Sequence, residues 1–252
     1  MTMGFRLGWQ RTKRQPDPSH LEIPHAGEVF RVAVRRVAAA RRFTLRVSAA
    51  TGDVVLTLPY RADFARAADF AQRHGGWIAA RVAKLPETVE LLPGAVVPIR
   101  GVEHRIENRP NARGTVWEEP RATGRPRLVV SGLPEHAHRR ILDFLKREAR
   151  KDIEAAVLRH TAALGKRATK ITIRDTTSRW GSCSTTGRLN FSWRLILAPP
   201  FVLDYLAAHE VAHLKEMNHS PRFWRLVYKL CENTDEAEAW LKRHGAGLHR
   251  FR

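Results

Sequence analysis

Residues 209–219 have the sequence His-Glu-Val-Ala-His-Leu-Lys-Glu-Met-Asn-His, which places three imidazoles and a carboxylate within eleven residues. On an α-helix, residues four apart lie on the same face, so His209 and His213 present their imidazoles to one metal ion. Glu210 reaches the same space without itself being a ligand. The spacing therefore predicts a zinc site in which a glutamate acts as general base towards water.

A catalytic zinc ion takes three protein ligands and keeps one position open, so one more ligand must come from beyond this helix. His219 is the predicted third ligand, because Asn218 suits a helix end and Ser220-Pro221 suits the start of the next helix. A tight bend between the two helices turns the His219 imidazole back towards the metal. The alternative ligands are three glutamates in or before the last predicted helix: Glu232, Glu236 and Glu238.

The segment before the metal helix is predicted to be a strand, and it contains the candidate substrate-binding residues Arg179, Trp180, Gly181 and Ser182. Gly181 permits a close backbone approach, and a strand here can pair with an extended substrate. In a second interpretation, the same segment is a core hairpin under the metal helix, with Trp180 as a packing residue. The substrate-binding and packing interpretations are compatible. The sequence does not decide which of Tyr205, Tyr228 and Arg179 stabilises the oxyanion that develops during hydrolysis. Cys183 is predicted to be a small buried residue.

Residues 179–224, RWGSCSTTGRLNFSWRLILAPPFVLDYLAAHEVAHLKEMNHSPRFW, resemble the YgjP-like metallopeptidases, which are relatives of the SprT-like zinc proteases. The resemblance covers about residues 135 to 245, and the preceding β-rich region is also similar to that family. It implies that His209, His213 and His219 bind zinc and that Glu210 is the general base. The metzincins share the interval from His213 to His219, but Glu216 stands where they have glycine, and no Met-turn follows.

The remaining pattern predicts an α+β protein with a small basic β-rich N-terminal domain and a minimal zincin-like metallopeptidase domain. The expected parts are a flexible basic tail (1–27), the β-rich domain with one helix (28–132) and the metallopeptidase domain (133–252). Alternating residues from Glu28 onwards predict a small antiparallel sheet. We expect a helix from Asp63 towards residue 84 that is interrupted at Gly75-Gly76, and a helix from Phe201 to about Met217. No internal repeat is evident in the sequence.

Composition places the chain among ordinary globular proteins, since 43% of its 252 residues are hydrophobic and 27% are charged. The two cysteines, Cys183 and Cys231, are far apart, which argues against a disulfide scaffold and favours a reducing compartment. The basic N-terminus lacks the apolar run of a signal peptide, and no long apolar stretch follows. We therefore expect a cytoplasmic protein that is neither secreted nor membrane-spanning.

The formal net charge is +19, and its distribution along the chain is uneven. Residues 201–252 carry eight Lys and Arg against seven Asp and Glu, so about +18 belongs to the first 200 residues. Such a field favours anionic partners, and a nucleic acid is a possible partner of the basic N-terminal region besides a peptide or protein substrate. Two alternatives to a simple peptidase follow: a nucleic-acid-associated protein with a structural zinc site, and a DNA-associated protease of SprT-like type. The arginines occur in scattered pairs without stacking aromatics, which is also typical of a solvated surface.

Overall fold

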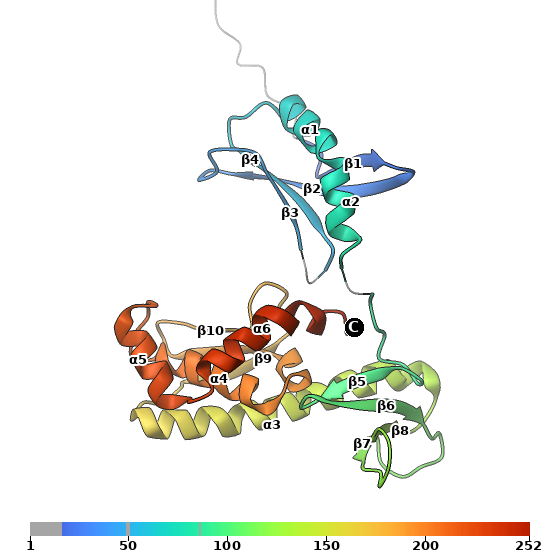
Figure 1. The fold of residues 1–252 in the computed structure, drawn as a ribbon, viewed down its shortest axis with the longest axis vertical. Helices are drawn as coiled ribbons and strands as arrows, with labels where there is room; N and C mark the ends of the chain where they lie inside the picture. Colours follow the sequence, from blue (N-terminus) through green and yellow to red (C-terminus); the bar gives the residue numbers. More distant parts are fainter. Residues whose placement is uncertain (1–16, 49–50, 86) are drawn as a thin grey trace, which may run out of the picture. The chain divides into compact units, whose positions relative to one another are not determined.

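The computed structural model describes residues 17–48, 51–85 and 87–252, which form two compact units (Figure 1). Unit 1 contains the described residues up to Ser48 together with Gly52–Leu85, and unit 2 contains the rest, chiefly residues 87–252. The sequence placed a boundary after residue 132, whereas the structure groups residues 87–132 with unit 2. The strands of that region pack on the long helix of unit 2, which explains the difference.

Unit 1 is built on a four-stranded sheet with the strand order β1-β2-β4-β3. The strands are β1 (His20–His25), β2 (Glu28–Val37), β3 (Thr44–Val47) and β4 (Val54–Pro59). The prediction of an antiparallel sheet was wrong in one respect, because β2 and β4 are parallel. Strand β3 lies at the outer edge, and β4 returns between β3 and β2.

The predicted flexible tail (1–27) was wrong for residues 20–25, which form β1, and Ile23 is buried in the core. Residues 1–16 of that tail lie outside the described residues. Helices α1 (Phe64–Arg73) and α2 (Gly75–Val82) pack on one face of the sheet, and the break between them falls at His74, as the Gly75-Gly76 pair predicted. The Asp63 carboxylate caps α1 by accepting a hydrogen bond of 3.0 Å from the Ala65 N–H.

Unit 2 begins with a sheet that repeats the topology of unit 1. Its strands are β5 (Val96–Ile99), β6 (Val102–Asn108), β7 (Val116–Glu119) and β8 (Arg127–Val130), in the order β5-β6-β8-β7. The two central strands are again parallel and the outer pairs antiparallel. The first hairpin of each sheet turns through two residues of positive φ, Ala26-Gly27 and Arg100-Gly101. This repeat is one of backbone topology and is not visible as sequence identity.

The rest of unit 2 forms the body that carries the predicted metal motif. Its elements are the 3₁₀ helices η1 (Pro134–His136) and η2 (Trp193–Leu197), the helices α3 (Ala137–Leu164), α4 (Pro200–Ala212), α5 (Pro221–Leu230) and α6 (Thr234–Leu248), and the strands β9 (Lys170–Arg174), β10 (Gly181–Cys183) and β11 (Arg188–Ser192). The three strands form a sheet of order β10-β11-β9, so β10 is an edge strand. Helix α4 packs against α3, α5, α6 and β10 (Figure 1).

The mixture of helices and strands confirms the α+β class. Gly165 ends α3 in the left-handed conformation with φ of 66°. Among the described residues, no helix combines the length and the apolar character needed to cross a membrane.

The two equivalent turn glycines provide a matched test of packing. A β-carbon at Gly101 would lie 3.1 to 3.3 Å from atoms of Pro199, whereas one at Gly27 would have no neighbour within 4 Å. Both residues have φ near 80°, so alanine at either site costs roughly 1–2 kcal/mol in backbone strain. We expect Gly101→Ala to lower the free energy of unfolding by at least about 1 kcal/mol more than Gly27→Ala, because it also overpacks its surroundings. Equal losses in thermal unfolding would contradict this account.

Candidate metal centre

Helix α4 holds the first two histidines and the glutamate of the motif in a buried setting. Its apolar residues are buried all round the helix rather than along one stripe, as expected of a helix that packs on several sides: Val202, Leu203, Leu206, Ala207, Ala208, Val211 and Ala212. The helix ends at Ala212, earlier than the predicted end near Met217. His213 is the C-cap residue and keeps helical dihedral angles (φ −64°, ψ −18°), so it still lies one turn from His209.

His219 lies in the turn between α4 and α5, as predicted. Ser220 begins α5 by accepting a hydrogen bond of 3.4 Å from the Phe223 N–H. The turn brings His219 Nε2 to 3.2 Å from His209 Nε2, and ligand atoms of His209, His213 and His219 all lie within 4.8 Å of one another.

The three imidazoles fit a zinc ion. Zn–N distances of 2.0–2.1 Å in a tetrahedral site separate two nitrogens by roughly 3.3 Å, close to the distance between the two Nε2 atoms. Within the described part of the chain, the cluster of potential ligands contains these histidines and none of Glu232, Glu236 and Glu238.

Contacts on the far side of each ring orient the first two imidazoles. His213 Nδ1 donates to the carbonyl oxygen of Glu216 at 2.9 Å, which leaves its Nε2 as the free ligand atom. His209 Nδ1 lies 3.4 Å from the Tyr205 hydroxyl, which donates to Glu238 Oε1 at 2.9 Å. Glu238 therefore contacts the site through Tyr205, and Tyr205 is a partner of His209 rather than a group that faces the open side. Outer contacts of this type fix the tautomer of a metal-binding histidine.

Burial also keeps these rings in the form that binds metal. Burial, together with charge repulsion from the neighbouring His213 and His219, lowers the pKa of His209 to about 4. Burial likewise lowers the pKa of His213, although its hydrogen bond to Glu216 acts in the opposite direction. Neutral imidazoles are the species that coordinate zinc, so the site is prepared for a cation at neutral pH.

Glu210 is the buried carboxylate of the centre. Glu210 is only 5% exposed. Burial raises the pKa of its carboxyl group to about 7, while the charge of Arg179 acts to lower that pKa. Its Oε2 atom has no hydrogen-bond partner among the described residues. A buried carboxylate oxygen without a partner is costly, which indicates a position meant for a bound species.

Gly181 of β10 lies directly against this carboxylate. A β-carbon at position 181 would lie 2.7 Å from Cγ and 2.8 Å from Cδ of Glu210, closer than real contacts allow. Only glycine fits here without displacing Glu210. The close backbone approach inferred from the sequence is therefore made to the general-base candidate itself.

A pocket of about 250 Å³ opens at the centre. It is lined by Gly181, Ser182, Cys183, His209, Glu210, His213, Met217 and His219. A neighbouring pocket shares Ser182 and is lined by residues 174–179 and Asn190. Met217 lines the pocket at the centre although it was not a predicted site residue; it is half exposed and lies between two of the histidines in the sequence.

The structure separates the four candidate substrate-binding residues. Gly181 and Ser182 line the histidine pocket, and Arg179 lines its neighbour. Trp180 stacks on His249 with ring centroids 4.8 Å apart, which matches the packing interpretation.

Two other residues considered from the sequence lie outside the ligand cluster. The Cys183 thiol lines the pocket, and burial raises its pKa to about 11. Tyr228 is exposed and donates to Asp235 at 2.6 Å. The contact between Tyr205 and His209 was missed, although its signal was present because Tyr205 precedes His209 by one helical turn.

The Tyr205 contact predicts a measurable effect on metal affinity. Tyr205→Phe removes the acceptor of the His209 Nδ1–H group, and loss of such an outer partner typically weakens metal binding by about 10- to 100-fold. Tyr228→Phe is the matched control, since it removes a hydroxyl that contacts only Asp235. Zinc dissociation constants from competition with a chelating dye measure the effect, and equal affinities in the two variants would contradict the assigned role.

Comparison with known proteins agrees with this centre. The family model described as "YgjP-like, metallopeptidase domain" matches residues 41–244. Among solved structures, the chain is similar to the metallopeptidase zymogen abylysin of Pyrococcus abyssi, with 23% identity over 36% of this chain and 93% of that chain, and a TM-score of 0.33, too low to carry a structural argument. No curated protein gives a significant match. Since the family model spans well over half of the chain and includes the whole candidate centre, this chain belongs to the YgjP-like family of metallopeptidase domains.

Proposed function

We propose that the chain is a zinc-dependent peptidase in which His209, His213 and His219 hold the metal and Glu210 is the general base. The observation that carries this proposal is the buried Glu210 carboxylate, which has an oxygen without a partner and lines the same pocket as the three imidazoles. Membership of a metallopeptidase family makes a peptide or protein the substrate. The two cysteines are free thiols, which supports a reducing compartment, and we propose the cytoplasm.

The chain's own residues account for the proton transfers of peptide hydrolysis. When bound, zinc supplies Lewis acidity, which makes water easier to deprotonate and a carbonyl more electrophilic. Glu210 takes the proton of the attacking water and then gives it to the leaving nitrogen. Gly181 leaves the space in which this carboxylate lies, since a β-carbon at that position would displace it.

Strand β10 is the proposed substrate-binding element. It pairs with β11 on one side and with no strand of the described chain on the other, and its residues line the histidine pocket. An extended peptide added to this edge would be held by main-chain hydrogen bonds, which depend little on its sequence. Gly181 and Ser182 would lie beside the scissile bond, and Arg179 would contact a more distant part of the peptide.

Substitution of the general base tests the mechanism. Glu210→Gln keeps the shape of the side chain but removes the proton acceptor, so we expect cleavage of a proteome-derived peptide library to fall by at least about 100-fold. Zinc content and thermal unfolding should stay close to those of the wild type. Glu236→Gln, at an exposed position on α6, is the control for loss of one negative charge. Unchanged cleavage by Glu210→Gln would support a structural zinc site instead.

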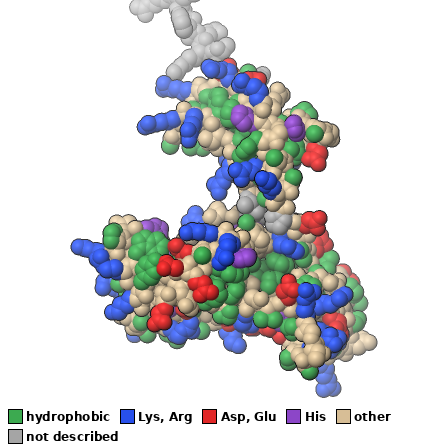
Figure 2. Space-filling model, in the orientation of Figure 1, with side chains coloured by type: hydrophobic (Ala, Val, Ile, Leu, Met, Phe, Trp, Pro, Cys, Tyr) green, Lys and Arg blue, Asp and Glu red, His purple; other side chains and the backbone are tan. Residues whose placement is uncertain are grey.

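Binding of nucleic-acid phosphates by unit 1 is a second candidate function. Its described residues carry eleven Lys and Arg against six Asp and Glu, and Lys and Arg prevail on the face drawn in Figure 2. Arg31, Arg35 and Arg46 alternate with residues of β2 and β3 that are buried in, or packed against, the core of unit 1, so they lie on the sheet face opposite the helices. None of them forms an ion pair with a carboxylate of the described residues.

The equivalent face of the second sheet is different, although the topology is the same. Arg127 and Arg109 both pair with Glu107, at 2.8 and 2.7 Å, and Arg109 also pairs with Glu119. Arg109 and Arg127 neutralise neighbouring glutamates, whereas Arg31, Arg35 and Arg46 of unit 1 have no carboxylate partner among the described residues. This contrast is the specific observation that favours a phosphate-binding role for unit 1.

The salt dependence of DNA binding tests this second candidate. Arg31, Arg35 and Arg46 changed together to Gln should reduce the slope of log affinity against log salt concentration by roughly 2 to 3, because each phosphate contact contributes about 0.9. The control changes Arg109, Arg125 and Arg127 to Gln, which removes the same charge from the ion-paired sheet. Fluorescence anisotropy with a labelled DNA duplex measures both slopes. An equal change in the two triple variants would rule out a local site on unit 1.

A further inference from the structure

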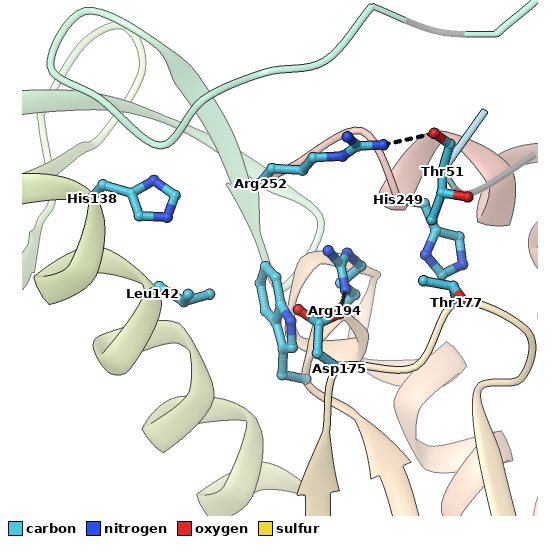
Figure 3. A pocket seen from close by; sticks show the side chains of 9 residues that line it. Thr51, His138, Leu142, Asp175, Thr177, Arg194, His249 and Arg252 are labelled. Atoms are coloured by element: carbon cyan, nitrogen blue, oxygen red, sulfur yellow. Dashed lines mark hydrogen bonds and ion pairs between the residues drawn. The ribbon is translucent and has the colours of Figure 1, made fainter. Parts of the chain in front are cut away.

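A second cavity of unit 2 lies apart from the three histidines and carries cationic and N–H groups. Figure 3 shows labelled side chains around it: His138 and Leu142 from α3, Asp175 and Thr177 from the segment after β9, Arg194 from η2, and His249 and Arg252 from the end of the chain. Trp193 also lines this cavity. Four segments that are distant in sequence therefore converge on one space.

Arg194 is the central charged residue of the cavity. It is buried, pairs with Asp175, and donates from Nη2 to the carbonyl oxygen of Phe251 at 3.1 Å. Its Nε–H group has no hydrogen-bond partner among the described residues. Arg194 thus keeps one unused donor while its other groups fix the guanidinium in place.

A second buried nitrogen nearby shares this property. His249 Nδ1 also lacks a hydrogen-bond partner within the described chain, whereas the Trp193 side chain is directed at Asp175 and helps to lower the pKa of that carboxyl. Buried polar groups are rarely left unpaired without a reason. Because the Arg194 Nε–H group and His249 Nδ1 are both unpaired among the described residues, the cavity suits an added anionic oxygen acceptor.

The cavity is connected to the metal centre by shared walls. Ser182 lines both the histidine pocket and the neighbouring pocket formed by residues 174–179. Asp175 and Thr177 line both that neighbouring pocket and the Arg194 cavity. A peptide that is bound at the histidines and extends through the neighbouring pocket would therefore approach Arg194.

We propose that the Arg194 cavity is a substrate subsite that binds a carboxylate of the peptide at a distance from the scissile bond. This inference rests on the proposed peptidase function and adds an acidic group to the description of its substrate. The carboxylate would come either from an Asp or Glu side chain or from the C-terminus of the peptide. Arg194 and His249 would bind it through their N–H groups beside the Trp193 indole, and Arg252 would add positive charge.

Binding to the inactive protein tests the subsite directly. We would titrate zinc-loaded, ¹⁵N-labelled Glu210→Gln protein with C-terminally amidated decapeptides that carry one Asp, scanned through the sequence, and with the corresponding Asn peptides. The readout is the indole N–H resonance of Trp193, assigned from the spectrum of Trp193→Phe. We expect one Asp position to shift this resonance and to bind roughly tenfold more tightly than its Asn counterpart. A response to free-acid peptides alone would assign the site to the peptide C-terminus.

Variants distinguish the cavity from general charge effects. Arg194→Gln should remove the preference for the carboxylate, and Arg150→Gln, at an exposed position on α3, should leave it unchanged. Because Arg194 also binds Phe251 and Asp175, His249→Asn and Arg252→Gln provide variants that keep those contacts, and each should reduce the preference. A Trp193 resonance that no peptide moves overturns the subsite, whether or not the wild type cleaves peptides. A shift without cleavage by the wild type would instead overturn the proposed peptidase function.

Discussion

The contact between Gly181 and the Glu210 carboxylate is the constraint on which the centre depends. Glu210 is held in a volume that leaves no room for a β-carbon on β10, so α4 and the edge strand must keep a fixed separation. Helix α4 is fixed in turn by α3, α5 and α6 and is buried on nearly all sides. A displacement of either element would let water reach the carboxylate or push it away from the imidazoles. The large apolar core of unit 2 therefore serves to maintain one polar contact.

The same burial determines the electrostatics of the centre. A low-dielectric setting disfavours charge, so it favours neutral imidazoles at His209 and His213. For the same reason it raises the pKa of the Glu210 carboxyl group. A bound dication reverses this preference for Glu210, since positive charge stabilises the carboxylate. Outer contacts to Tyr205 and Glu216 hold the rings in orientation before any ion arrives. The protein thus places unfavourably buried groups where a cation would compensate for them.

Local spacing explains which features were predictable from the sequence. The i,i+4 pair of His209 and His213, the bend at His219 and the cap at Ser220 each depend on a few neighbouring residues, and all lie where the sequence indicated. The position of the boundary between the two units, the mixed sheets and the link from Tyr205 to Glu238 depend on contacts between distant segments. Periodicity shows that strands exist, but it does not give their order. For that reason the repeated topology of the two sheets became visible only in the structure.

Comparison of the two sheets shows that the pairing of individual arginines is more informative than the net charge of the chain. Both sheets present arginines on the face opposite their helices, yet Arg127 of unit 2 is paired with a glutamate and Arg31 of unit 1 is paired with none of the described carboxylates. An unpaired arginine keeps its full field and stays available to a partner, whereas an ion-paired arginine mainly offsets its neighbour. Position within the fold, rather than the net charge, therefore decides which basic residues are candidates for binding. The same reasoning applies to Arg194, whose partner Asp175 leaves the Nε–H group free and the cavity with an excess of donors.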